Sequence, residues 1–193
     1  MADPVTGTAI ASRVGDVSDE GLAQRGRDVD AFAELYRRYR DPAYRIARRY
    51  SSDDDDTIDV VAASFEHAFA QLHTFDPARG SFAAWLLRIT RNLAIDSGRR
   101  RDRFARLRSL YLRGHPDDDR GPEAIVLARD DLAELRRVVA GLSPVDREAL
   151  ALRYGERLSA REIATVTGRS VAATEKTLSR ALAKVRKELN NVE

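Results

Sequence analysis

The chain has 193 residues, of which 43% are hydrophobic and 33% are charged, a composition that supports two small folded cores better than one large core. Its 33 Lys and Arg against 31 Asp and Glu leave a formal charge of only +2, so net charge alone does not indicate a nucleic-acid partner. The absence of cysteine excludes disulfides, thiolate zinc sites and cysteine nucleophiles. No leader pattern and no apolar run of membrane length occurs, so we expect a cytoplasmic protein without membrane insertion.

Helical spacing of apolar residues begins after an acidic N-terminal stretch. Residues 1–23 have no helical period and predict a mobile tail. From Asp28 apolar residues recur at steps of three and four, and Pro42 predicts a second helix that meets the first near Asp41. Residues 58–72 carry another apolar stripe, and Ser81 can cap a longer helix that follows it. Residues 24–112 are therefore expected to form one helical domain.

A basic cluster follows the apolar part of that last helix. Six arginines lie between Asp96 and Arg108 against two aspartates, and such a run is as often a solvated face as a binding surface. Aromatic residues around the loop 74–80 favour binding, because aromatic surfaces, polar loop atoms and cations together grip unpaired bases. One of them, Trp85, lies at helical spacing with Ile89, which is more typical of a core residue than of a stacking surface.

The second half of the chain has clear signals for where helices begin and end. Residues 113–130 combine prolines, glycines and three consecutive aspartates and predict a flexible linker. In the domain 131–193 we expect helices near 131–140, 144–153, 160–166 and 171–189, with Ser143 and Ser159 as N-caps. No stretch alternates with a period of two for long enough to predict a sheet. The sequence thus predicts an all-α protein of two small helical domains joined by a flexible linker.

The last two of these helices are separated by only four residues, 167–170, which is the helix-turn-helix pattern. Its second helix would present small, hydroxyl and cationic side chains that can contact phosphates and base edges in a major groove. An ordinary helical hairpin with a solvated face is the alternative. The expected inward positions are Ile163, Ala164, Val166, Val171, Leu178 and Leu182; the expected outward positions are Arg169, Ala172, Ala173, Thr174, Lys176, Thr177 and Arg180.

Catalytic motifs are scarce. Asp53 to Asp56 with His67, His73 and Asp76 supply ligand types for a metal-dependent nuclease, but their spacing does not support one, and an acidic run suits a helix N-terminus. No phosphate-binding glycine loop, nucleophile elbow or paired-histidine motif is present. We therefore expect no enzyme activity, no metal or cofactor and no small-molecule substrate.

Residues 28–189 resemble the bacterial RNA polymerase sigma factors of the extracytoplasmic-function (ECF) class. DVVAASFEHAF at 59–69 resembles the region 2.2 helix of that family, and GSFAAWLLRITRNLAID at 80–96 closely resembles the helix after it. LSPVDRE at 142–148 and the helix-turn-helix ending in SRAL at 179–182 resemble region 4. The resemblance implies an alternative sigma factor that binds polymerase core, recognises promoter minus-10 and minus-35 elements, promotes melting and is held inactive by an anti-sigma factor. A plain helix-turn-helix regulator is the second hypothesis.

The resemblance also implies a role for individual residues. Region 2 would contact the β′ clamp helices of the polymerase through Asp59, Val60, Ala63, Phe65 and Glu66. It would hold the minus-10 element, double-stranded and melted, through Phe75, Asp76, Arg79, Gly80, Ser81, Trp85, Arg88, Arg91, Asn92, Arg99, Arg100, Arg101 and Arg103. Region 4 would rest on the β flap and contact the minus-35 element through Arg169, Ser170, Ala173, Thr174, Lys176, Thr177 and Arg180. The stretch 173–177, ATEKT, departs from the family's usual TVKSR.

Overall fold

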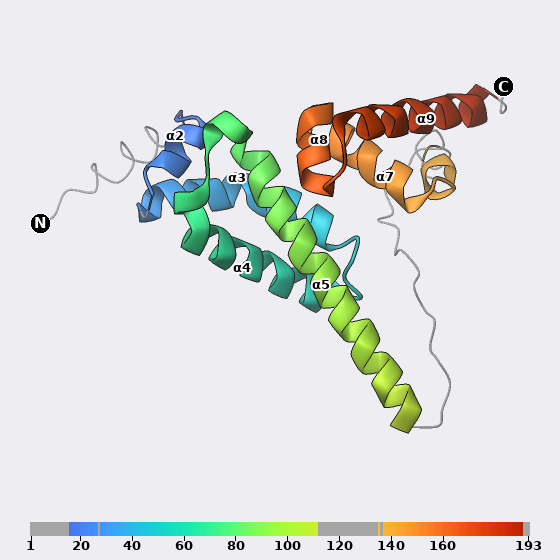
Figure 1. The fold of residues 1–193 in the computed structure, drawn as a ribbon, viewed down its shortest axis with the longest axis horizontal. Helices are drawn as coiled ribbons and strands as arrows, with labels where there is room; N and C mark the ends of the chain where they lie inside the picture. The colour runs from blue at the N-terminus through green and yellow to red at the C-terminus, as the bar shows by residue number, and fades with distance from the viewer. Residues whose placement is uncertain (1–15, 27, 112–134, 136, 191–193) are drawn as a thin grey trace, which may run out of the picture. The chain divides into compact units, whose positions relative to one another are not determined.

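The computed structural model describes residues 16–26, 28–111, 135 and 137–190, and for 106–111 it describes the backbone only. Every regular element within these ranges is helical, which confirms the all-α prediction (Figure 1). The chain divides into two compact units, 1–117 and 118–193, with a boundary inside the predicted linker 113–130, which itself lies outside the described residues. No helix within the described ranges is long and apolar enough to cross a membrane.

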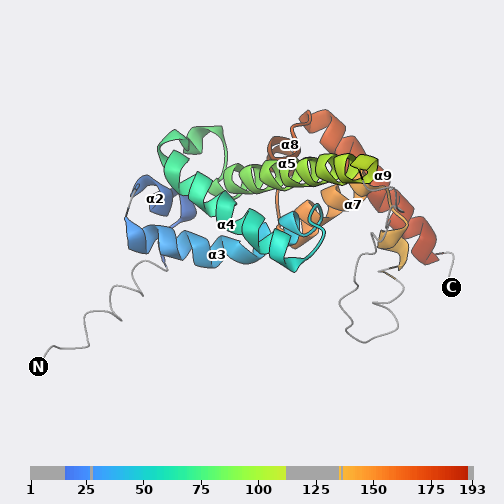
Figure 2. The same cartoon turned by 90° about the horizontal axis from the view of Figure 1, so that it is seen from below.

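Within its described residues the N-terminal unit contains the α-helices α2 (Asp19–Gln24), α3 (Val29–Ala47), α4 (Asp54–Gln71) and α5 (Phe82–Tyr111). The side chains of Ser18, Asp28 and Asp53 accept backbone N–H donors at the starts of α2, α3 and α4 and so satisfy groups that a helix leaves unpaired. Helices α3, α4 and α5 pack against one another pairwise. The C-terminal half of α5 extends beyond the other helices of this unit (Figures 1 and 2).

The prediction of a mobile tail over residues 1–23 is wrong for its last residues, because helix α2 begins at Asp19. Leu22 is fully buried and Ala23 nearly so. The carboxylate of Asp19 accepts a hydrogen bond from Arg38 at 2.6 Å and another from the hydroxyl of Tyr39, and these bonds tie α2 to α3. A helix of six residues is too short to show a periodic apolar pattern, so the sequence alone did not predict it.

The predicted break near Asp41 is also wrong, because α3 runs without interruption through Pro42. Proline removes one backbone donor from the helix. However, Ala43, Ile46 and Ala47 beyond it are buried on the same helix as Ala31 and Leu35 before it. Continuous packing of this face stabilises a single helix more than the missing hydrogen bond destabilises it.

The C-terminal unit contains α7 (Pro144–Leu150), α8 (Ala160–Thr167) and α9 (Val171–Asn190), and residues 137–140 are helical before them. The predicted helix 144–153 ends earlier, because its last turn widens into a π-helical segment, Ala151–Gly155. Ser143 caps α7, and Ser159 with Glu162 forms the predicted capping box of α8. Both α7 and α8 pack on α9. The core of this unit includes Leu142, Ala149, Leu152, Leu158, Ile163, Val166 and Ala181.

Candidate nucleic-acid interface

The outer face of α5 carries an exposed polar stripe. Arg88, Asn92, Asp96, Arg99 and Arg103 follow one another at steps of four, four, three and four, so they share one side of the helix, and all five are exposed. Arg99 lies 3.8 Å from the carboxylate of Asp96, with 74% of its side chain exposed. Three cations along one helix face can attract the phosphates of a nucleic acid.

Two of the predicted minus-10 residues lie on a different side of α5. The guanidinium of Arg91 lies 5.7 Å from the centroid of the Tyr50 ring. Arg101 donates to the carboxylate of Asp56 and, at 3.0 Å, to the carbonyl of Tyr50. Arg100 is exposed beside it. Among the arginines predicted to hold the minus-10 element, Arg101 therefore differs from its neighbours in being bound to an acid of another helix, α4.

Three aromatic rings gather where the loop 75–81 joins the start of α5. The ring centroids of Phe75, Phe82 and Trp85 lie 5.5 to 5.6 Å apart, and Tyr39 adds a further contact to Phe82 at 5.5 Å. Phe82 is fully buried, whereas Phe75 and Trp85 are half-buried. The aromatic cluster thus has a core member and two members that retain an accessible edge.

The loop beside this cluster is shaped by its own side chains. Asp76 accepts from the backbone N–H of Ala78 at 2.9 Å, and Ser81 accepts from the N–H of Ala84 at 3.3 Å, which makes Ser81 the predicted cap of α5. Gly80 has a φ of 153°, a conformation that favours glycine. Asp76 and Arg79 are exposed. A capped and sharply turned loop therefore presents an acid and a cation next to aromatic rings.

The predicted polymerase-contacting residues of α4 divide into two groups. Asp59, Ala63 and Glu66 are exposed, as a docking surface requires. Val60 and Phe65 are 5% and 4% exposed, and the Phe65 ring packs against rings of α3. The assignment of Val60 and Phe65 to a contact surface is wrong, because both are core residues that hold α4 against its neighbours.

The helix-turn-helix pattern is present as α8, a turn with Gly168 at a φ of 70°, and α9, which Ser170 caps by accepting from Ala173 at 3.2 Å. Of the minus-35 residues, five are exposed and two are not. The exposed residues are Arg169, Ser170, Ala173, Lys176 and Arg180. Val171, which the sequence places inward, is 40% exposed.

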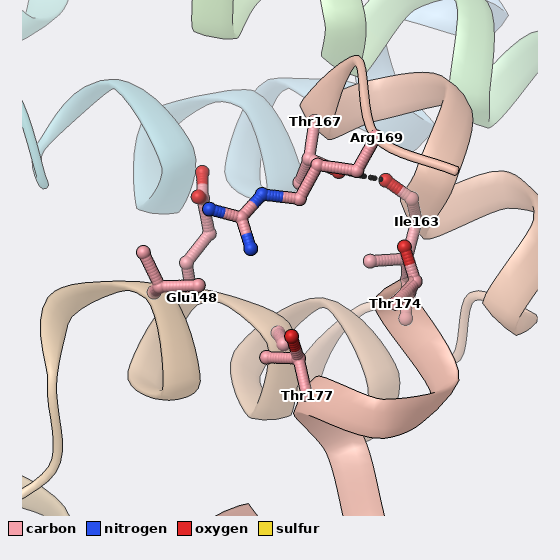
Figure 3. A pocket seen from close by; sticks show the side chains of 8 residues that line it. Glu148, Ile163, Thr167, Arg169, Thr174 and Thr177 are labelled. Carbon is pink, nitrogen blue, oxygen red and sulfur yellow. Dashed lines mark hydrogen bonds between the residues drawn. The ribbon is translucent and has the colours of Figure 1, made fainter. Parts of the chain in front are cut away.

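Thr174 and Thr177 are buried, at 2% and 6% exposure, so their predicted outward position is wrong. Both line a cavity of about 10 Å³ between α7, α8 and α9, together with Glu148 and Arg169 (Figure 3). Their hydroxyls donate to the carbonyls of Ser170 and Ala173, at 3.0 and 2.9 Å. Because the helix itself satisfies each hydroxyl, threonine can serve here as a small core residue.

The acidic run at 53–56 has structural roles. Asp53 accepts from the N–H of Asp56 at 2.8 Å as the cap of α4, and this hydrogen bond, more than any other contact, lowers the pKa of the Asp53 carboxyl. The Asp54 carboxylate accepts from the hydroxyl of Tyr44 at 2.9 Å. Within the described residues no group of three or more His, Asp or Glu side chains is arranged to hold a metal ion.

Sequence reasoning missed two acidic residues that organise these surfaces. Asp56 binds Arg101 across 45 positions, and the fully buried Asp146 binds Arg180 and Lys184 of α9. Local periodicity carries no signal for pairs so far apart in sequence. An acid at an apolar position of a predicted helix, as Asp146 is, was the one available clue.

Comparison with known proteins identifies both units. Residues 35–104 match the family Sigma-70 region 2, and residues 132–185 match the family Sigma-70, region 4. Over 166 residues the chain is 34% identical to the RNA polymerase sigma factor CnrH of Cupriavidus metallidurans, with 80% of this chain and 84% of CnrH covered. It is also 34% identical over 170 residues to the ECF RNA polymerase sigma factor SigE of Mycolicibacterium smegmatis. That match covers 86% of this chain but only 61% of SigE.

Solved structures agree with these matches. The structure of CnrH in complex with the cytosolic domain of CnrY aligns with a TM-score of 0.61 at 30% identity, covering 91% of this chain and 99% of CnrH. RpoE of Bartonella quintana, in complex with the anti-sigma factor NepR, aligns over 82% of this chain and 96% of its own with the same TM-score; at 23% identity it supports the fold alone. The chain therefore belongs to the ECF class of RNA polymerase sigma factors, a family of transcription initiation factors that are not enzymes.

Proposed function

We propose that this chain is an alternative sigma factor that binds RNA polymerase core, recognises promoter minus-10 and minus-35 elements and promotes DNA melting. The exposed stripe of Arg88, Arg99 and Arg103, on the helix whose start joins the loop 75–81 and its aromatic cluster, is the observation that carries the proposal. The arginines supply sequence-independent attraction to phosphates. The loop and the half-buried rings of Phe75 and Trp85 supply a place where an extruded base can stack.

Region 4 would contribute duplex contacts at the minus-35 element. The candidates are the exposed residues Arg169, Ser170, Ala173, Lys176 and Arg180 of the turn and of α9. Arg180 also binds Asp146, so its charge is partly engaged within the unit. We therefore assign the duplex contacts chiefly to Arg169 and Lys176, with Ala173 available to a thymine methyl group.

Two protein partners complete the proposal. The exposed face of α4, which includes Asp59, Ala63 and Glu66, is the candidate contact with the β′ clamp helices, and region 4 would rest on the β flap. An anti-sigma factor would hold the protein inactive. The support is that CnrH, 30% identical to this chain in the structural alignment, is described in complex with the cytosolic domain of CnrY.

Transcription in vitro tests the proposal. Adding the protein to a bacterial polymerase core should direct initiation to discrete start sites on a genomic template, mapped by the 5′ ends of the transcripts. The triple variant Arg88→Gln, Arg99→Gln, Arg103→Gln should lose this activity. A matched variant, Arg25→Gln, Arg37→Gln, Arg40→Gln, removes the same charge from exposed positions of the same unit and should retain it.

Three outcomes would overturn the proposal. Equal loss in both triple variants would mean that only net charge matters. Binding of DNA without core, and with no effect on where core initiates, would favour a plain helix-turn-helix regulator. Cleavage of the template that a chelator abolishes would favour a metal-dependent nuclease.

A further inference from the structure

Helix α5 rests on the turn between α3 and α4 at one point near its middle. At this point the guanidinium of Arg101 makes two hydrogen bonds with different groups: one nitrogen donates to the carboxylate of Asp56, and the other donates at 3.0 Å to the backbone carbonyl of Tyr50. The Arg101 side chain is 36% exposed and that of Asp56 is 21% exposed. A planar guanidinium held by two acceptors, one in α4 and one in the connection before it, has a fixed orientation.

The Asp56 carboxylate is itself held on several sides. It accepts from the hydroxyl of Ser97 on α5 at 3.1 Å and from the N–H of Ser52 at 3.3 Å, in addition to Arg101. Its own N–H is capped by Asp53. One carboxylate therefore joins the start of α4, the preceding turn and two successive turns of α5.

The backbone makes a close approach at the same place. A Cβ atom at Gly98 would lie 3.3 Å from the carbonyl oxygen of Tyr50, tighter than an ordinary contact, so glycine lets α5 come this near. Arg91 adds a contact to the ring of Tyr50. Positions 91, 97, 98 and 101 lie on one side of the helix, opposite the exposed stripe.

Exposed side chains follow on α5 from Arg103 to Ala105. Arg103, Phe104 and Ala105 are all exposed, Phe104 at 70%, and the helix extends past the rest of the unit (Figure 1). The direction of the basic half of α5 therefore depends on the contacts at and just before Arg101. A small rotation there would displace Arg103 relative to the aromatic loop.

We propose that Arg101 is a positioning residue: with Asp56 it fixes the direction of the basic half of α5 and does not itself bind phosphate. This inference rests on the proposed function, because it assigns the DNA contacts of α5 to the exposed arginines. It also reverses the role that resemblance to the family implies for Arg101. Asp56 neutralises the charge of Arg101, so a phosphate at this point would compete with a carboxylate already in place.

The salt dependence of promoter binding separates the two roles. We expect Arg103→Gln to reduce the slope of log affinity against log salt by about 0.7 to 0.9, because one phosphate contact is lost. Arg101→Gln should weaken binding about fivefold at every salt concentration and leave the slope unchanged. Binding is measured by fluorescence anisotropy with polymerase holoenzyme on a labelled fork-junction promoter.

The variant Asp56→Asn should change promoter affinity in opposite directions under the two roles of Arg101. If Arg101 bound DNA, removing its acidic competitor would strengthen binding and steepen the salt dependence. If Arg101 positions α5, the variant should weaken binding about as much as Arg101→Gln, and the double variant should be no worse than either single one. Stronger binding by Asp56→Asn would overturn the inference.

A distance measurement tests positioning directly. Because the chain has no cysteine, single cysteines can be placed at the exposed positions Ala63 on α4 and Ala105 on α5 and given spin labels. We expect Arg101→Gln to broaden the distribution of distances between the labels, and Arg103→Gln to leave it unchanged. An unchanged distribution in Arg101→Gln, with thermal melting showing a folded protein, would overturn the inference.

These results also separate the inference from the proposed function. If Arg103→Gln has no effect on affinity or slope, the proposed DNA contact by α5 fails, whatever Arg101 does. If Arg103→Gln behaves as expected while Arg101→Gln lowers the slope equally, the proposed function stands and the positioning role fails.

Discussion

The carboxylate of Asp146 in α7 is fully buried, and Arg180 of α9 donates to it at 2.5 Å. Lys184, one turn further along α9, donates to the second carboxylate oxygen at 3.4 Å. Two cations of the helix that carries the candidate minus-35 contacts are thus bound by one acid of the helix beneath it. The ion pair of Asp146 and Arg180 sets the rotation of α9 in its unit, much as Asp56 and Arg101 set the direction of α5.

Asp146→Asn should destabilise the C-terminal unit by about 2 kcal/mol at pH 7, because charge-assisted hydrogen bonds are lost and Arg180 keeps a charge without its partner. Thermal or urea unfolding of the protein measures this. The control is Glu175→Gln, which changes an exposed acid on α9 and should stay within about 0.5 kcal/mol of the wild type. Equal stability of Asp146→Asn and wild type would show that the pair contributes nothing.

The same carboxylate predicts a pH dependence. Burial disfavours the charged form, but hydrogen bonds from Arg180 and Ser143 outweigh it, and the pKa of Asp146 lies below its usual value of 3.8. A depressed folded-state pKa contributes stability that is present above the unfolded-state pKa and is lost as the pH falls through the folded-state value. The stability difference between wild type and Asp146→Asn should therefore shrink below about pH 4. A difference that stays constant from pH 7 to pH 2 contradicts the pairing.

Leu22→Ala tests whether α2 is part of the N-terminal unit. Leu22 is fully buried, so truncation should cost about 2 to 4 kcal/mol of unfolding free energy through lost burial and a cavity. Gln24→Ala, at an exposed position of the same helix, is the control and should have little effect. A mobile tail would make the two variants indistinguishable in denaturant unfolding.

N-capping residues predicted where several helices start. The elements that the sequence did not predict depend on contacts between residues far apart in the chain. Ser143 before Pro144, Ser159 with Glu162, Ser81 and Ser170 all cap the helices that their positions indicate, because a cap needs only neighbours a few residues away. Helix α2 and the continuity of α3 through Pro42 depend on packing against partners elsewhere in the chain. Such partners leave no periodic trace in the segment itself.

The candidate site shows the same contrast between features that local sequence predicts and features that depend on distant residues. The exposed arginine stripe of α5 follows from helical periodicity alone, whereas Arg101 was indistinguishable from its neighbours until Asp56 was placed beside it. Threonine was misplaced on α9 because it is amphipathic: with its hydroxyl bonded to the carbonyl four residues earlier, the remaining methyl suits a core.

Arg157→Gly should stabilise the C-terminal unit. Arg157 has a φ of 56°, a left-handed conformation that costs a residue with a Cβ about 1 kcal/mol and costs glycine little. We expect a gain of about 0.5 to 1 kcal/mol in thermal unfolding. The control is Arg186→Gly, in the interior of α9 and also exposed, where glycine should cost about 1 kcal/mol. A loss in both variants would show that the side chain of Arg157 outweighs its backbone strain.

The variants Thr177→Val and Lys176→Gln distinguish a core residue of α9 from a residue that contacts DNA. Valine branches at Cβ as threonine does, and the hydroxyl of Thr177 donates at 2.9 Å to the carbonyl of Ala173 in the same helix, so no partner in another element loses a hydrogen bond. The variant should therefore fold and bind a minus-35 duplex with unchanged affinity. Were Thr177 a base contact, the same change would cost about 1 to 3 kcal/mol of discrimination. Lys176 is exposed at the preceding position, and its replacement by Gln should weaken binding uniformly across sequences and reduce the salt slope by about 1. Competition binding of holoenzyme to promoters that differ only in the minus-35 element measures both, and a change of sequence preference in Thr177→Val would return that residue to the interface.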